Sequence, residues 1–133
     1  MIKLLSTQLD ERSLTQFGIE ASSLLMQHDY IGLANQFGYA LANSREPVAA
    51  LEADYLRAVA SPYITGSEQE PSIMVKYFSP NSTGLFAVVE CDVPVHEGAV
   101  VLLELIVAGK GDVKGITVEG ISGVGDANND RPE

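Results

Sequence analysis

The stretch from Ile73 to Ile121 constrains the fold most, because four apolar runs follow one another there with turn residues between them. The runs read SIMVKYF, LFAVVECDV, AVVLLELIVA and VKGITVEGI, and the connectors SPNSTG, PVHEG and GKGD contain Gly, Pro or Asn. Connectors of about four to six residues are too short for the helical crossover that joins parallel strands. The runs therefore predict a four-stranded antiparallel meander built from hairpins.

Two amphipathic helices are predicted before the sheet. From Ser13 to His28, apolar residues recur at helical spacings, and Ser13 is the expected N-cap. The same spacing returns after Asp29 and continues through Ala42, with Asp29 as the expected N-cap of the second helix. Residues 1–12 give a mixed signal, so they are expected either to extend the first helix or to lie on the surface.

A third helix is expected to begin at Pro47 and to end at Ser61 and Pro62. The fixed φ and missing N–H of proline suit the first position of a helix, and a second proline cannot continue it. The residues that follow are polar and without periodicity, which predicts a loop leading to the sheet.

The chain is predicted to form one α+β domain. Its 133 residues are enough for a single hydrophobic core. Residues 1–122 would form this domain, with a helical half over 1–62 and a sheet half over 73–122. Residues 123–133 are expected to be a flexible tail, because glycines, asparagines and acids leave nothing to pack. Two or three N-terminal helices are expected to pack on one face of the four-stranded antiparallel meander.

Alternation along the four runs divides the predicted sheet into two faces. The face expected beneath the helices is almost wholly apolar and includes Val75, Val89 and Leu103. The opposite face is half apolar, and in water it would form a patch of the size that marks an interface. We therefore expect this outer face to bind a second copy of the chain in an isologous homodimer. The expected interface residues are Phe78, Phe86, Val88, Leu102, Glu104 and Ile106.

The chain is strongly acidic. Its formal net charge is −10, and residues 63–133 carry eleven acidic side chains against four basic ones. Such a field repels nucleic acid and anionic membranes and would speed encounter with a basic protein, although solubility alone is another interpretation. There is no run of about 18 apolar residues and no secretory signal, so no membrane span is expected and the expected location is cytoplasmic.

Few residues suggest catalysis or a metal site. The single cysteine, Cys91, and the two histidines have no metal-ligand spacing, so neither a metal nor a cofactor is expected. Cys91 lies within a strand pattern and is expected to be a buried structural thiol. Asp54 is expected on the solvent side of its helix, which argues against acid/base catalysis. A register error of one residue would instead bring Glu90 and Glu104 beneath the helices.

Three segments carry a family resemblance: HDYIGLANQFGYALA, EPVAALEADYLRAVA and VVLLELIVAGKGDVKGITVEGIS. Helices followed by long closing hairpins in this order resemble the nuclear transport factor 2-like fold, the cystatin-like α+β cone. The strand that this fold usually has between its first helices and its main sheet is not evident in the sequence. Members of the superfamily include isomerases, dehydratases and binding domains, so the resemblance does not select an activity. A ligand pocket of this kind would be lined by Tyr30, Tyr55 and Tyr77.

The sequence supports three functional hypotheses. The first is a non-enzymatic interaction domain that forms a homodimer and binds a protein or a small apolar ligand. The second is an immunity-like protein that neutralises a basic toxin, which suits a small acidic chain. The third is a small cone-fold enzyme that acts on an apolar substrate.

Overall fold

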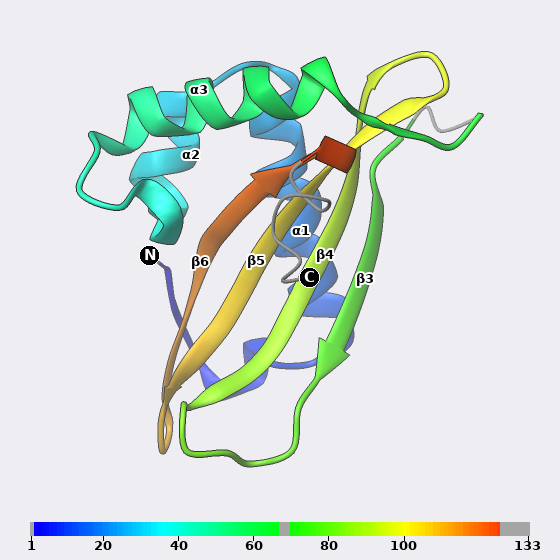
Figure 1. Ribbon diagram of the computed structural model, residues 1–133. Coiled ribbons are helices and arrows are strands. Elements are labelled where there is room, and N and C mark those ends of the chain that lie inside the picture. The colour runs from blue at the N-terminus through cyan, green and yellow to red at the C-terminus, as the bar shows by residue number, and fades with distance from the viewer. Residues whose placement is uncertain (1, 67–69, 126–133) are drawn as a thin grey trace, which may run out of the picture.

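A six-stranded antiparallel sheet and three α-helices make up the fold in the computed structural model, which describes residues 2–66 and 70–125 (Figure 1). Two single-turn 3₁₀ helices, Ser6–Gln8 and Ala40–Ala42, lie among these elements. The helices are α1 (Glu11–Met26), α2 (Tyr30–Phe37) and α3 (Pro47–Ala60). The strands are β1 (Ile2–Leu4), β2 (Tyr63–Ile64), β3 (Ser72–Tyr77), β4 (Leu85–His96), β5 (Ala99–Lys110) and β6 (Val113–Ser122).

The four predicted strands are present as β3 to β6, and each pairs antiparallel with its neighbour in the chain. The full sheet has the order β1-β6-β5-β4-β3, with β2 also paired to β5. The predicted count of four strands was therefore wrong. β1 and β2 are three and two residues long. Strands this short have no periodicity of their own and exist because β6 and β5 offer them an edge.

The helix starts follow from side chains that accept from the free N–H groups of the first turn. Asp29 accepts from the N–H of Gly32 at 2.8 Å, as predicted for the start of α2. The predicted N-cap of α1 was wrong, because Asp10 takes that position and Ser13 donates its hydroxyl to the Asp10 carboxylate at 2.6 Å. The α1 helix consequently begins two residues earlier, at Glu11.

The ends of α2 and α3 depend on local backbone chemistry. α2 ends at Phe37 rather than Ala42, because Gly38 has a φ of 75° that a helix cannot contain. Pro47 is the first residue of α3, as predicted, and the carboxylate of Glu46 accepts from the N–H groups of the first turn at 2.8 and 3.1 Å. The α3 helix ends at Ala60, just before Ser61 and Pro62.

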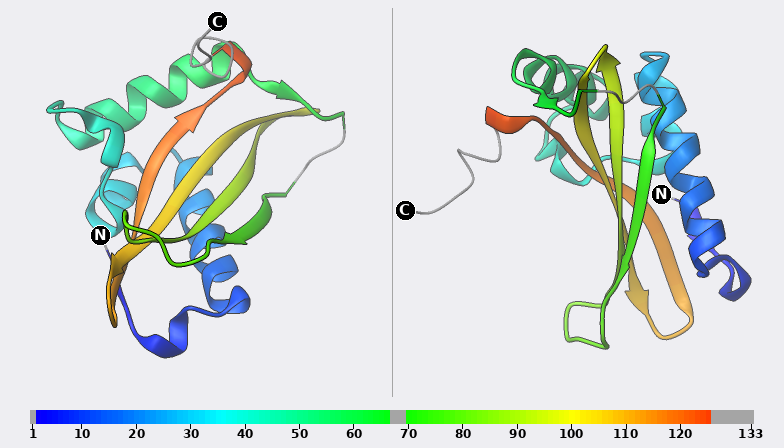
Figure 2. Two further views of the ribbon diagram at one scale, coloured as in Figure 1. Left: turned by 60° about the horizontal axis from the view of Figure 1, so that its bottom comes forward. Right: turned by 90° about the vertical axis from the view of Figure 1, so that its right-hand side faces the viewer.

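The helices do not all lie on one face of the sheet. α1 lies along one face and contacts β3 and β4, while α3 crosses the end of the sheet and contacts β5 and β6 (Figures 1 and 2). α2 lies between α1 and α3 and contacts both. The expectation of a helical layer over one face thus holds for α1 and needs correction for α3.

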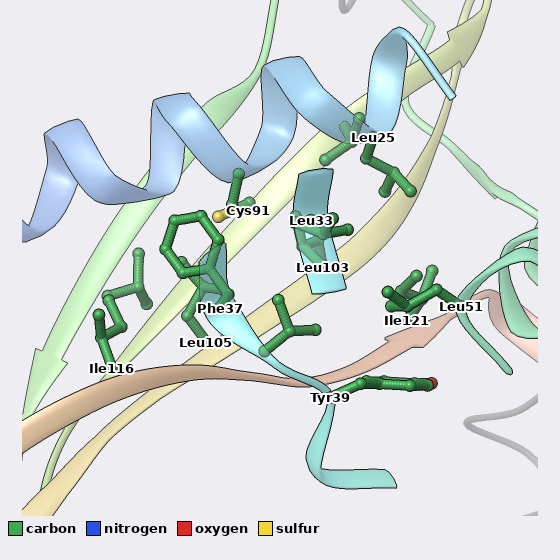
Figure 3. Packing of buried hydrophobic residues seen from close by; sticks show 14 of the residues in the cluster. Leu25, Leu33, Phe37, Tyr39, Leu51, Cys91, Leu103, Leu105, Ile116 and Ile121 are labelled. Atoms are coloured by element: carbon green, nitrogen blue, oxygen red, sulfur yellow. The ribbon is translucent and has the colours of Figure 1, made fainter. Parts of the chain in front are cut away.

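The hydrophobic core lies between the helices and the face of the sheet that was predicted to be covered. Leu33 and Phe37 of α2 lie above Leu103 and Leu105 of β5, and all four side chains are fully buried (Figure 3). Fully burying such a side chain contributes about 1.5–3 kcal/mol. The sheet residues of this core are Ala87, Val89, Cys91, Val93, Val101, Leu103, Leu105, Val107, Ile116, Val118 and Ile121.

Cys91 is buried in this core, as predicted for a structural thiol. Burial raises the pKa of its thiol to about 12, so the thiol is protonated and unreactive. A Cβ at Gly18 of α1 would lie 2.9 Å from Ile73 and 3.3 Å from the Cys91 sulfur. Glycine at this position therefore allows α1 to lie directly on β3 and β4.

Two further features concern the chain as a whole. None of the helices within residues 2–66 and 70–125 is long and apolar enough to cross a membrane. Residues 123–125 of the predicted tail are described, and Val124 donates its N–H to the carbonyl of Ser61 at 2.7 Å. The remainder of that tail, residues 126–133, lies outside the described part of the chain.

Candidate functional site

The outer face of the sheet, on the side away from α1, is the candidate site. This face is turned toward the viewer in Figure 1, where α1 lies behind the strands. Phe78 is 43% exposed, and the other predicted interface residues on this face are partly exposed. Five of the six residues predicted from the sequence lie here, namely Phe78, Val88, Leu102, Glu104 and Ile106. The prediction for Phe86 was wrong, because the register shift in β4 between Leu85 and Ala87 lets its ring pack against the core and against Tyr77 of the covered face.

A row of four side chains, aliphatic at its two middle positions, crosses the middle of the outer face. Val88 of β4 lies directly opposite Ile106 of β5, and Lys76 and Thr117 continue the row on β3 and β6. We call these four residues the central row. Its two middle side chains are aliphatic and only partly buried, although they project from the two central strands of the sheet.

Three carboxylates lie to one side of the central row. Glu90 is directly opposite Glu104, and Glu119 lies beside them at the register shift between β5 and β6. We call Glu90, Glu104 and Glu119 the carboxylate row. Like charges that face each other across strands destabilise a sheet, and the ion pair between the Lys76 ammonium and Glu90 at 3.0 Å offsets only part of this. An arrangement that breaks a local rule in this way is typical of a functional surface.

Glu104 lies at the middle of the carboxylate row and is the most strongly affected. Burial raises the pKa of its carboxyl group, and the nearby charges of Glu119 and Glu90 raise it further, while Lys76 lowers it. The folded chain therefore holds a proton on Glu104 more tightly than an exposed glutamate would.

An aromatic and basic group lies at the end of the sheet near the β5–β6 turn, where Lys114 is on the helix-covered face, directly opposite the core residue Leu4 of β1. Phe78 donates its N–H to the carbonyl of Phe86 at 3.0 Å, which places the two residues opposite each other at the ends of β3 and β4. The Lys114 ammonium is 5.2 Å from the centre of the Phe86 ring and donates to the carbonyl of Gly111 at 2.6 Å. We call Phe78, Phe86 and Lys114 the aromatic end. These residues line a hollow of about 330 Å³.

A second polar group, centred on Asp54 of α3, is structural. Asp54 is only 3% exposed, so its predicted place on the solvent side of the helix was wrong. Arg45 donates to both of its carboxylate oxygens, at 3.0 and 2.9 Å, and the Tyr39 hydroxyl donates to one of them. Arg45 also donates to the carbonyl of Ala42 at 2.7 Å, so this network fastens the turn after α2 to α3.

The charge on Asp54 is stabilised by this network. Burial raises the pKa of the carboxyl group, but hydrogen bonds from Arg45 and Tyr39, together with the charges of Arg45 and Arg57, outweigh it and hold the pKa below 3.8. The pKa of the Tyr39 hydroxyl is raised by burial and by Asp54. Each group in this cluster is thus held in one protonation state at neutral pH, which suits a structural role and not proton transfer.

The tyrosines predicted to line a ligand pocket lie in two places. The rings of Tyr30 and Tyr55 have centroids 6.1 Å apart, and the His28 ring lies 5.4 Å from Tyr55. Tyr77 is distant from this group, because its hydroxyl donates to the carbonyl of Leu9 at 2.7 Å and its ring lies 5.5 Å from Phe86. The structure brings two of the three tyrosines together, and their role in ligand binding stays a prediction.

The two carboxylates whose position would have favoured an enzyme lie on the outer face. Glu90 and Glu104 pair directly across β4 and β5 and project away from the core residues Val89 and Leu103. No group of three or more His, Cys, Asp or Glu side chains that could hold a metal ion is found among the residues that the structure describes. Comparison with family models, curated proteins and solved structures finds no match for the chain.

Proposed function

We propose that this chain is a non-catalytic interaction domain that forms an isologous homodimer through the outer face of its sheet. The observation that carries the proposal is the pair of aliphatic side chains at the middle of this face. Val88 and Ile106 lie directly opposite each other and are only partly buried, although both of their strands are paired along both edges. A second copy of the same face would bury both side chains.

The symmetry of such a dimer follows from the carboxylate row, which lies to one side of the central row. A two-fold axis that lies in the interface and runs along the central row reverses the strand direction and keeps each strand over its own copy. This axis places the carboxylate row of one protomer over the Phe78 end of the outer face of the other. An axis parallel to the strands would instead place the two carboxylate rows together.

Packing in this dimer would resemble that of two aligned sheets. Sheets that pack face to face keep their strands within about 30° of parallel or antiparallel, which this axis allows. The partly exposed side chains of Val88 and Ile106 would meet their own copies at the axis and become buried. Separation of the two carboxylate rows would then favour this symmetry over one that brings them together.

Light scattering coupled to size-exclusion chromatography tests this proposal. The wild-type protein is expected to have twice the 14.2 kDa mass of the chain. Ile106→Glu is expected to reduce this to the mass of one chain, because residues on the axis meet their own copies and the change would place two carboxylates together. The matched control is Ile31→Glu on α2, where the side chain is 63% exposed and far from the outer face in the sequence and the fold. A wild-type protein that is monomeric at all concentrations tested would contradict the proposal.

We also propose that the resemblance to the nuclear transport factor 2-like fold extends to the segment between α2 and α3. Support comes from Tyr39, which forms an isolated parallel bridge with Val118 of β6. This contact lies where that fold usually has a strand between its first helices and its main sheet. A crystal structure in which Tyr39 does not pair with β6 would remove this support.

A further inference from the structure

We propose that the hollow beside β2 is a second binding site, which accepts a lysine or arginine side chain from a basic protein partner. This hollow lies at the end of the outer face beyond the carboxylate row and has a volume of about 520 Å³. It shares Glu90 with the carboxylate row and Leu102 with the predicted interface, so the basic partner and a second copy of the chain would compete for this end of the outer face. The proposal goes beyond the homodimer, because a monomer would also bind the partner. The lining residues are Tyr63, Ile64, Thr65, Ser72, Met74, Glu90, Asp92, Val100 and Leu102.

The shape of the hollow follows from β2, which lies beside β5 beyond the end of β6. Tyr63 and Ile64 pair with Val100 and Ala99, so the chain after α3 forms a wall beside the sheet. Ile64 is 76% exposed and Met74, on the opposite wall, is 58% exposed. These apolar side chains provide a surface for the methylene groups of a long side chain.

The charges of the hollow select a cation. Glu90 and Asp92 are two residues apart on β4 and therefore project from the same face, and no lining residue is basic. Glu90 already accepts the ammonium of Lys76 at 3.0 Å, which shows that a lysine head group fits against this wall. A carboxylate has about four acceptor positions, so a second cation can bind beside the first. The net charge of −10 would also attract a basic partner over longer distances.

The hollow at the aromatic end provides an internal comparison. It is lined by Phe78, Phe86 and Lys114, among others, and has no carboxylate in its lining. A cationic side chain would meet Lys114 there and would be repelled. The two hollows therefore predict opposite responses to the same probe.

A titration with short peptides, followed by amide chemical shifts in two-dimensional NMR spectra, tests this site. The probe is acetyl-Gly-Arg-Gly-amide, and its neutral counterpart has citrulline in place of arginine. Shifts on adding the arginine peptide are expected at Tyr63, Ser72, Met74 and Asp92 and not at Phe78. Asp92→Asn is expected to weaken binding about tenfold, because a charge-assisted hydrogen bond is lost. Glu97→Gln, at the exposed tip of the β4–β5 hairpin, is the matched control and is expected to leave binding unchanged.

Two outcomes would overturn the inference. Equal shifts with the citrulline peptide would show that the cation is not recognised. Shifts spread over acidic residues throughout the chain, with no loss in Asp92→Asn, would show general electrostatic attraction only. The titration is repeated with Ile106→Glu, which is expected to be monomeric. Binding that persists there separates this site from the dimer, so failure of the homodimer proposal and failure of this inference give different results.

Discussion

The two faces of the sheet are built from the same strands but obey different rules. On the inner face, Val89 and Leu103 are fully buried beneath the helices and carry no charge. On the outer face, their neighbours Glu90 and Glu104 oppose each other with like charges, which weakens the isolated protomer. The inner face therefore explains why the chain folds, whereas the outer face has features that the proposed homodimer would account for.

The largest expected effect comes from shortening one side chain on each face at adjacent positions. Leu103→Ala is expected to lower the free energy of unfolding by about 3 kcal/mol, because it leaves a cavity in a fully buried site. Leu102→Ala, on the partly exposed outer face, is expected to cost less than about 1 kcal/mol. Urea unfolding of both variants in the Ile106→Glu background, which is expected to be monomeric, measures the difference. Similar losses at the two positions would contradict the assignment of the faces.

The next largest effect is expected from replacing Asp54, the buried carboxylate of α3. Asp54→Asn is expected to lower the free energy of unfolding by about 2 kcal/mol, because hydrogen bonds to a buried charge are lost. Glu52→Gln, on the exposed side of the same helix, is the control and is expected to have little effect.

The pH dependence of Asp54 follows from its lowered pKa. Because the folded pKa lies below the ordinary value of 3.8, the stabilising contribution is complete above that value and is lost as the pH falls through the folded pKa. The wild-type protein should therefore lose stability as Asp54 is protonated, whereas Asp54→Asn should not show this loss at low pH. Acid titrations of the two proteins, followed by circular dichroism, measure this difference. Identical pH profiles would contradict the role given to Asp54.

The smallest effect concerns Glu104 and has the opposite sign. Its pKa is raised above the ordinary value of 4.5, so its contribution favours the folded state at low pH and weakens as the pH rises through the folded pKa. At neutral pH, Glu104→Gln is expected to raise the free energy of unfolding by about 0.5 kcal/mol, because it removes repulsion from Glu90 and Glu119. Urea unfolding in the Ile106→Glu background measures this, with Glu97→Gln in the same background as the control. A loss of stability would contradict the account of the carboxylate row.

Much of the sheet could be predicted from the sequence because its signals are local. Alternation with period two places Val89 and Leu103 on one face and Glu90 and Glu104 on the other without knowledge of the remaining chain. Turn residues then fix the order of the hairpins. The short strands β1 and β2 could not be found in this way, because they form only where another strand leaves an edge unpaired.

The burial of Asp54 is indicated by its spacing along α3, but the charge of its side chain favoured an exposed position. Asp54 lies three residues after Leu51 and four before Ala58, so it belongs to the buried stripe of α3. A carboxylate at such a position is buried only where a cation reaches it, and Arg45 reaches it because the chain turns back between α2 and α3. The three glutamates of the carboxylate row could be assigned to the outer face from the sequence. Which of them lie opposite each other depended on the register of β4, β5 and β6.

Mixing two oppositely charged variants of Ile106 tests the proposed outer-face dimer most directly. Ile106→Glu alone would place two carboxylates together on the axis, and Ile106→Lys alone would place two ammonium groups together, so each is expected to be monomeric in light scattering. In an equimolar mixture the heterodimer brings one glutamate against one lysine, and the measured mass is expected to be twice the 14.2 kDa of one chain. If both variants remained dimeric alone, or if the mixture stayed monomeric while the wild-type protein is a dimer, the proposed symmetry would be contradicted.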